Sequence, residues 1–119
     1  MGDDAQRPGI RRSRCLVEGV IRARAGGDEA EGAIVDLSLS GARILRPAGW
    51  SLVEGAPASL RLLVPGEVPL AIGGRVSRVG VDAVAFSFAH LAPPAEIALR
   101  DIIERRGQLR DDFDDVGDA

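Results

Sequence analysis

The chain of 119 residues contains no tyrosine and no lysine, and only one cysteine. That cysteine, Cys15, cannot form a disulfide within the chain, which favours a reducing compartment such as the cytoplasm. No apolar run is long enough to span a membrane, and polar residues precede the first apolar run. We therefore expect a soluble cytoplasmic protein without a signal peptide and without membrane insertion.

Aromatic residues make up 3% of the chain, whereas hydrophobic residues as a whole make up 45%. The core must therefore be built mainly from valine, leucine, isoleucine and alanine. A chain of this length has room for one compact domain, and such a core suits a small barrel. The only large rings are Trp50, Phe86, Phe88 and Phe113.

The net charge is −3, which argues against a general binder of nucleic acid, because such binders use many cations to neutralise phosphates. The charges are nevertheless unevenly distributed, with arginines concentrated before residue 25 and aspartates after residue 110. All 15 basic residues are arginine, whose planar fork favours specific contacts with anions and bases. A GC-rich genome, which favours arginine codons, accounts equally well for this bias.

Residues 1–14 are polar and predict a flexible, arginine-rich arm. Alternating apolar residues and Gly- or Pro-containing turns then indicate a mainly β domain, an antiparallel barrel or sandwich. Its expected strands lie around residues 15–24, 33–37, 41–46, 60–64, 70–76 and 84–88.

The period changes after Pro93 and Pro94 to that of a helix, whose apolar stripe is Ala95, Leu99, Ile102 and Ile103. Gly107 is a plausible end of this helix. The architecture that we predict over residues 15–107 is a six-stranded antiparallel β-barrel closed by a C-terminal α-helix. Residues 108–119 are predicted to form an acidic, disordered tail.

One short segment combines several residues with chemical potential: Asp36, Ser38 and Gly41, in the pattern D-x-S-x-x-G. Aspartate, serine and glycine are also ordinary turn residues, so a turn between two strands is an alternative interpretation of this segment. Upstream lies a cluster of four arginines: Arg7, Arg11, Arg12 and Arg14.

Together these features resemble the PilZ domain family, whose hallmark is an RxxxR arm before the first strand and [DN]xSxxG between the second and third. The resemblance covers residues 7–107 and includes the segments 42–44, 52–55, 74–76, 85–88 and 99–103. It implies a PilZ-type barrel and a bacterial, noncatalytic receptor for the second messenger cyclic di-GMP. The implied ligand-binding residues are Arg7, Arg11, Arg12, Arg14, Asp36, Ser38 and Gly41.

The residue types suit a guanine nucleotide for physical reasons. A guanidinium can read the O6 and N7 acceptors of guanine, and the Asp36 carboxylate could accept from N1 and N2 on the other edge. Ser38 could donate to a phosphate oxygen or hold the loop through a local bond. Gly41 could take a positive φ and let a ligand approach closely.

The arginine pair has two possible registers. In the first register, Arg7 and Arg11 form the pair, because they have the RxxxR spacing. In the second, Arg14 belongs to the pair, because it lies at the usual distance before the first strand, and Arg11 or Arg12 acts with it in a shortened arm. Arg11 fits both registers, and all four arginines remain candidates.

We expect a cyclic di-GMP-binding receptor or adaptor that changes the conformation of its arm on binding. It would signal to an unidentified effector protein in the control of motility, exopolysaccharide or biofilm. The alternative is a PilZ-like adaptor that binds proteins and no nucleotide. A nucleic-acid binder is disfavoured by the absence of lysine and of exposed aromatics, an enzyme by the absence of a catalytic set, and a cofactor or metal site by the absence of ligand spacing.

Overall fold

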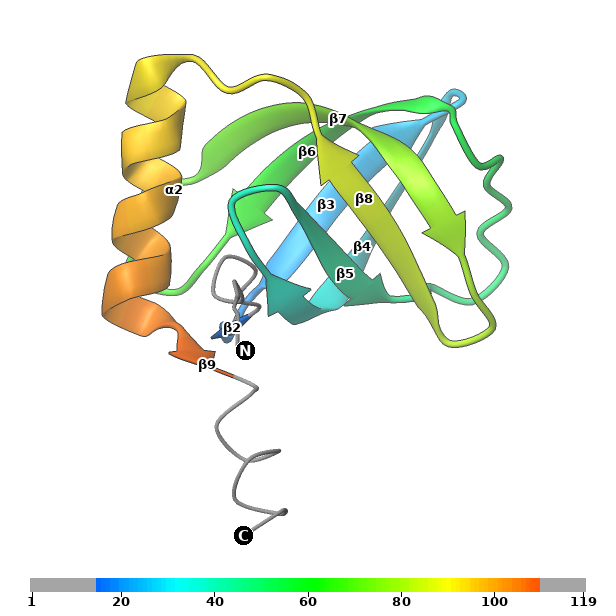
Figure 1. Cartoon of the computed structure of the whole chain (residues 1–119). Helices are drawn as coiled ribbons and strands as arrows, with labels where there is room; N and C mark the ends of the chain where they lie inside the picture. Colours follow the sequence, from blue (N-terminus) through cyan, green and yellow to red (C-terminus); the bar gives the residue numbers. More distant parts are fainter. Residues whose placement is uncertain (1–14, 110–119) are drawn as a thin grey trace, which may run out of the picture.

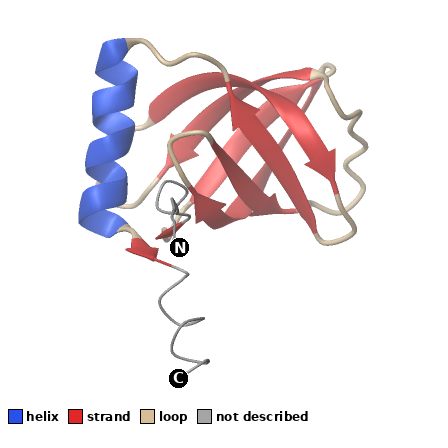
Figure 2. Ribbon diagram, in the orientation of Figure 1, coloured by secondary structure: helices blue, strands red, loops and turns tan. Residues whose placement is uncertain are grey.

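The computed structural model describes residues 15–109 (Figure 1). The predicted arm, residues 1–14, lies outside the described residues, and so does the part of the predicted acidic tail from residue 110 onward. Strands dominate the described part, and a single helix stands at one end of them (Figure 2).

The strands form a closed antiparallel barrel, so the predicted six-stranded barrel with a C-terminal helix is confirmed. Its order is β3-β6-β7-β8-β5-β4, and pairing of β3 with β4 closes the ring. Four of the strands begin earlier or end later than the sequence pattern indicated, and are longer than predicted. The strands are β3 (Val20–Ala25), β4 (Asp28–Leu37), β5 (Gly41–Leu45), β6 (Pro57–Leu63), β7 (Leu70–Val79) and β8 (Ala83–Phe88).

The inner face of the barrel is filled mainly by aliphatic side chains, as the composition predicted. Burial alternates along β3 and along β6, because successive side chains of a strand point to opposite faces. The largest apolar side chains that are fully buried are Ile21, Leu37, Ile44, Val76, Val84 and Leu99.

The prediction of one continuous strand over residues 15–24 is wrong, because these residues belong to two strands. β2 (Cys15–Leu16) pairs with β4 through Cys15 and Leu37, and β3 begins only at Val20. The strand is interrupted before Val20, at Gly19. Its φ is 155°, and a Cβ there would lie 2.7 Å from the carbonyl oxygen of Leu63. The inward face was nevertheless predicted correctly, since Cys15, Val17, Ile21 and Ala23 are all buried.

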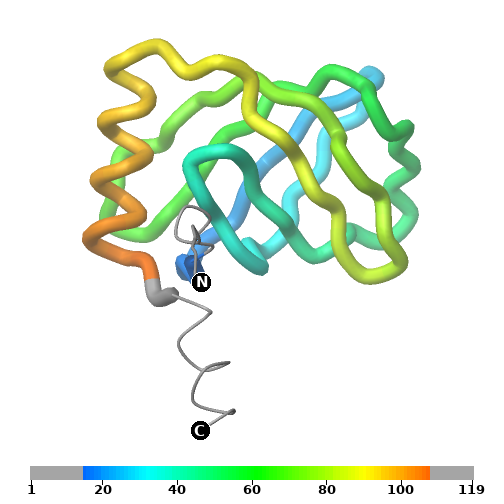
Figure 3. Tube along the Cα trace, in the orientation of Figure 1, coloured from blue at the N-terminus to red at the C-terminus, as the bar shows by residue number. Residues whose placement is uncertain are grey.

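The predicted boundary at residue 107 also needs correction. Gln108–Leu109 form a further strand, β9, which pairs antiparallel with β2. Figure 3 shows the start of the described chain close to the C-terminal end of the helix that precedes β9. Regular structure therefore extends two residues into the segment that was predicted to be a disordered tail.

The helix α2 (Pro93–Arg106) covers one end of the barrel (Figure 1). Leu99 and Ile102 face the core, and the Gly107 N–H donates to the Ile103 carbonyl to end the helix. The loop between β5 and β6 runs along the opposite side, and its Trp50 is 5% exposed and belongs to the same core. With 14 residues, α2 is too short to cross a bilayer, and the described part of the chain has no other candidate.

The C-terminal end of α2 is held by Glu67, which lies in the turn between β6 and β7. Glu67 Oε2 accepts hydrogen bonds from Arg105 Nη1 at 2.6 Å and from Arg106 Nε at 2.8 Å. The Glu67 side chain is only 9% exposed. These two hydrogen bonds lower the pKa of Glu67 below its ordinary value of 4.5.

Replacing Glu67 by glutamine should destabilise the protein in a pH-dependent way. Because folding lowers the pKa of Glu67, its contribution is complete above pH 4.5 and is lost as the pH falls through the lowered value. The difference in unfolding free energy between the wild type and Glu67→Gln should therefore be larger at about pH 7 than at about pH 3 in urea titrations. Glu96→Gln, which removes only the exposed pair with Arg100, is the matched control. A Glu67→Gln effect that is equal at both pH values would contradict this account.

Candidate functional site

The D-x-S-x-x-G pattern lies on the hairpin between β4 and β5, on the side of the barrel where β2, β9 and α2 meet (Figure 1). Asp36 is near the end of β4, Ser38 is in the turn, and Gly41 begins β5. All three predicted motif residues are thus brought together within one hairpin. What they contact differs from the sequence-based expectation for two of them.

Ser38 stabilises the turn. Its N–H donates to the Gly41 carbonyl at 2.9 Å, and its Oγ lies 3.3 Å from the same oxygen. The Ser40 N–H donates to Ser38 Oγ at 3.2 Å. The Ser38 side chain is 7% exposed, so holding the loop, one of its two expected roles, is the one seen in this structure.

Gly41 is required by the neighbouring strand, and the expectation of a positive φ at this position is wrong. A Cβ on Gly41 would lie 2.3 Å from the Phe86 carbonyl oxygen of β8. The two strands are paired at this point through Gly41 and Ser87, and the Phe88 N–H donates to the Ser40 carbonyl. The close approach that demands glycine is therefore made by backbone of the same chain.

Asp36 forms a tight ion pair with Arg43, its cross-strand neighbour on β5. Asp36 Oδ2 accepts from Arg43 Nε at 2.9 Å and from Nη2 at 2.6 Å. The Asp36 side chain is 0% exposed, whereas the Arg43 side chain is 40% exposed. The expectation that Asp36 meets the donor edge of guanine directly therefore does not agree with this geometry, because a fully covered carboxylate is not accessible to a ligand.

Arg43 is the residue that sequence reasoning missed as a member of the site. Its carboxylate partner occupies Nε and Nη2, and Nη1 makes no hydrogen bond to any residue in the range 15–109. The available signal was its spacing: Arg43 follows Gly41 by two residues on a strand, and therefore shares the outer face with it. An arginine held on one side and exposed on the other can present donors and a flat face to a ligand.

The four predicted arm residues, Arg7, Arg11, Arg12 and Arg14, lie outside the described residues. Their point of attachment is described, however, because Cys15 pairs with Leu37, between Asp36 and Ser38. Arg11 is four residues from Cys15, which a fully extended chain spans in about 14 Å. Chain length alone thus permits these arginines to reach the hairpin, and the choice of register stays a prediction.

The profile of the PilZ domain family matches residues 7–105, which is most of the chain. This chain belongs to the PilZ domain family. No curated protein sequence matches it significantly. The match includes the arginine cluster and the hairpin, and the family resemblance inferred from those residues is confirmed.

Solved structures agree with this fold at low sequence identity. The PilZ domain of CeSA from a cellulose-synthesizing bacterium has a TM-score of 0.65 and 20% identity, covering 77% of this chain and 95% of that chain. The Bacillus subtilis inhibitor of motility, MotI/DgrA, has a TM-score of 0.66 and 16% identity over 78% of this chain and 49% of that chain. MrkH of K. pneumonia has a TM-score of 0.68 and 15% identity over 87% and 51%, so this chain spans about half the length of the last two proteins.

Gly41→Ala should destabilise this PilZ domain strongly, because the added methyl group collides with the Phe86 carbonyl oxygen and forces the two strands apart. We expect a loss of about 1–3 kcal/mol in the free energy of unfolding, measured by urea titration. Gly73→Ala is the matched control, since a Cβ on this β7 glycine has no neighbour within 4 Å. Equal stabilities of the two variants would refute the proposed reason for glycine at position 41.

Proposed function

We propose that this PilZ domain is a noncatalytic receptor for cyclic di-GMP. The observation that carries the proposal is the complete D-x-S-x-x-G hairpin with the arginine-bearing arm attached directly beside it, through Cys15 and Leu37. A dinucleotide with two guanines and two phosphates offers several acceptors to guanidinium groups. The arm and the hairpin together supply such groups from two sides.

In this proposal Asp36 acts through Arg43. The buried carboxylate fixes the guanidinium by two hydrogen bonds to one oxygen, so that Arg43 keeps a defined orientation at the surface. Its Nη1 and its flat face are then available to a phosphate or to a guanine ring. Fixing the arginine before the ligand arrives reduces the conformational entropy that binding must cost.

The arm supplies the conformational change. Arginines from the segment 7–14 close over the ligand and replace contacts with water by contacts with guanine and phosphate. The ligand shifts the arm only to the extent that it binds the closed form more tightly than the open one. The closed arm presents a new surface next to β2, which is where an effector would detect the bound state.

The receptor acts in the cytoplasm through a separate effector protein in this proposal. PilZ domains are generally noncatalytic receptors, so the response is passed to another protein. Two of the similar structures carry names that refer to motility and to cellulose synthesis, which supports motility, exopolysaccharide or biofilm control as the output.

A second candidate function is that of a protein-binding adaptor without nucleotide affinity. One observation favours it: every residue of the D-x-S-x-x-G pattern has a structural use in this hairpin. A sequence could therefore keep the pattern for folding alone. The two candidates differ in whether the purified domain binds cyclic di-GMP.

Calorimetric titration with cyclic di-GMP separates the two candidates. A receptor should bind with a dissociation constant of about 1 μM or lower, which corresponds to about −8 kcal/mol. GTP and cyclic di-AMP serve as controls for selectivity. Absence of heat, together with an unchanged melting temperature at high ligand concentration, would favour the adaptor.

Once binding by the wild type is established, Arg43→Gln and Arg11→Ala should each weaken it by about tenfold or more, since each removes a charge-assisted donor. Arg100→Ala, which removes an exposed arginine on α2, is the matched control and should bind like the wild type. Melting curves verify that the variants are folded. Wild-type affinity in Arg43→Gln would exclude Arg43 from the site and leave the receptor function itself intact.

A further inference from the structure

A hollow with charged side chains at its edge lies on the outer face of β3 and β6, away from the β4–β5 hairpin. Its volume is about 350 Å³, and an adjoining hollow along β4 shares Arg22 and Glu29 with it. Neither the D-x-S-x-x-G pattern nor Arg43 contributes to it. The hollow is lined by Arg22, Arg24, Glu29, Ser59, Leu60, Arg61 and Ala71.

Two arginines stand directly opposite each other in this hollow. Arg22 on β3 and Arg61 on β6 are cross-strand partners, an arrangement of like charges that destabilises a sheet. Arg22 is compensated by Glu31 at 3.3 Å and by Glu29 at 3.6 Å. Arg61 makes no hydrogen bond or ion pair with any residue that the structure describes.

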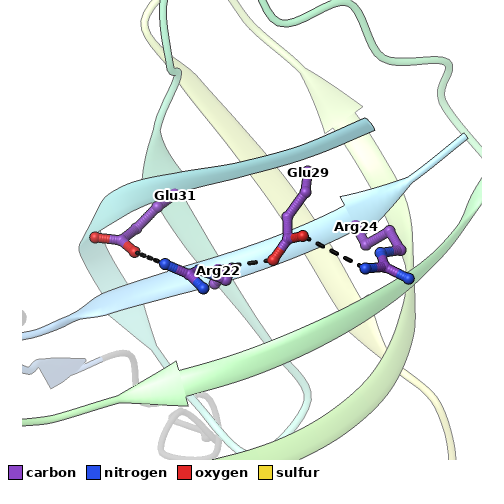
Figure 4. Close-up of polar contacts among 4 residues, drawn as sticks. All are labelled: Arg22, Arg24, Glu29 and Glu31. Carbon is purple, nitrogen blue, oxygen red and sulfur yellow. Dashed lines mark hydrogen bonds and ion pairs between the residues drawn. The ribbon is translucent and has the colours of Figure 1, made fainter. Parts of the chain in front are cut away.

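The two carboxylates near the hollow, Glu29 and Glu31, both lie on β4. Figure 4 shows the order Glu31, Arg22, Glu29, Arg24 along β3 and β4, with an ion pair between each neighbour and the next. On the β6 side, two small residues of β7 lie across from this face. Ser59 pairs with Gly73, and Arg61 pairs with Ala71, so no large side chain of β7 stands opposite Arg61.

The charges define what this surface can bind. Three arginines and two glutamates leave a local net charge of about +1, centred on Arg61. A polyphosphate or a nucleic acid would meet the carboxylates of Glu29 and Glu31, which repel it. One carboxylate of a polypeptide, placed in the hollow beside Arg61, matches both the charge and the space.

We propose that the outer face of β3 and β6 is a protein-docking surface whose partner presents an acidic side chain to Arg61. The proposal goes beyond nucleotide binding, because it holds for a receptor and for a nucleotide-free adaptor alike. Binding would relieve the repulsion between Arg22 and Arg61, which the isolated domain carries as a cost in stability. If Arg61 had a purely structural role instead, replacing it would lower the stability of the isolated domain.

The first test uses the isolated domain. Arg61→Glu converts the Arg22–Arg61 repulsion into attraction and should raise the melting temperature by about 1–4 °C. Arg61→Gln, which only removes the repulsion, should raise it by less. A lower melting temperature in both variants would overturn the proposal, because Arg61 would then stabilise the fold.

The second test measures binding by fluorescence anisotropy of a labelled peptide in which glutamate and threonine alternate. The wild type should bind it saturably, and Arg61→Glu should weaken binding by about tenfold or more. Arg78→Glu, with the same change of charge at an exposed position of β7, should bind like the wild type. Equal binding by Arg61→Glu, equal binding of a glutamine–threonine peptide, or tighter binding of pyrophosphate than of the acidic peptide would each overturn the proposal.

Discussion

The register of β4 is the constraint on which the rest of the molecule depends. This strand pairs with β3 through residues 28–33, with β5 through its second half, and with β2 at Leu37. An irregularity between Ile34 and Asp36 shifts the pairing with β5. Because a shift of one residue exchanges the two faces of a strand, this irregularity allows Leu37 to enter the core while Asp36 meets Arg43 on the outer side. The register of β4 as a whole therefore determines how the barrel closes, how the hairpin is formed and where β2 joins the sheet.

The Asp36–Arg43 pair would link stability to recognition in the proposed receptor. A carboxylate that is 0% exposed is costly unless it is compensated, and the pair with Arg43 contributes to that compensation. Arg43 in turn is ordered at a half-exposed position, where an arginine would otherwise sample many rotamers. In the proposed receptor, this arrangement would let a buried aspartate matter for a ligand that it does not touch.

Sequence patterns predicted the barrel, its helix and its family because these depend on hydrophobic period and on short motifs. Cys15, Val17 and Ile21 were assigned to the inner face correctly even though the strand that carries them is broken, since burial selects apolar residues regardless of hydrogen bonding. The break at Gly19, the Asp36–Arg43 pair and the reason for Gly41 were not predictable in this way. Gly19 and Gly41 are decided by backbone from strands far apart in sequence, at Leu63 and Phe86. The Asp36–Arg43 pair depends on the register within one hairpin, which an irregularity between Ile34 and Asp36 shifts.

The site and the end of the helix share a physical connection through β2. Residue 15 pairs with Leu37 of the hairpin and with Leu109 of β9, and a Cβ on Gly107 would lie 2.9 Å from the Cys15 Cβ. The end of α2 is therefore fixed by two contacts, Glu67 on one side and the β2–β9 pair on the other. Contact between the hairpin, β2 and the end of α2 does not by itself couple them. Coupling requires an element with two arrangements that a ligand binds with different affinities. The two-residue strands β2 and β9 are the shortest of the sheet, so in the proposed receptor a change in the arm would act there before it could act on the barrel.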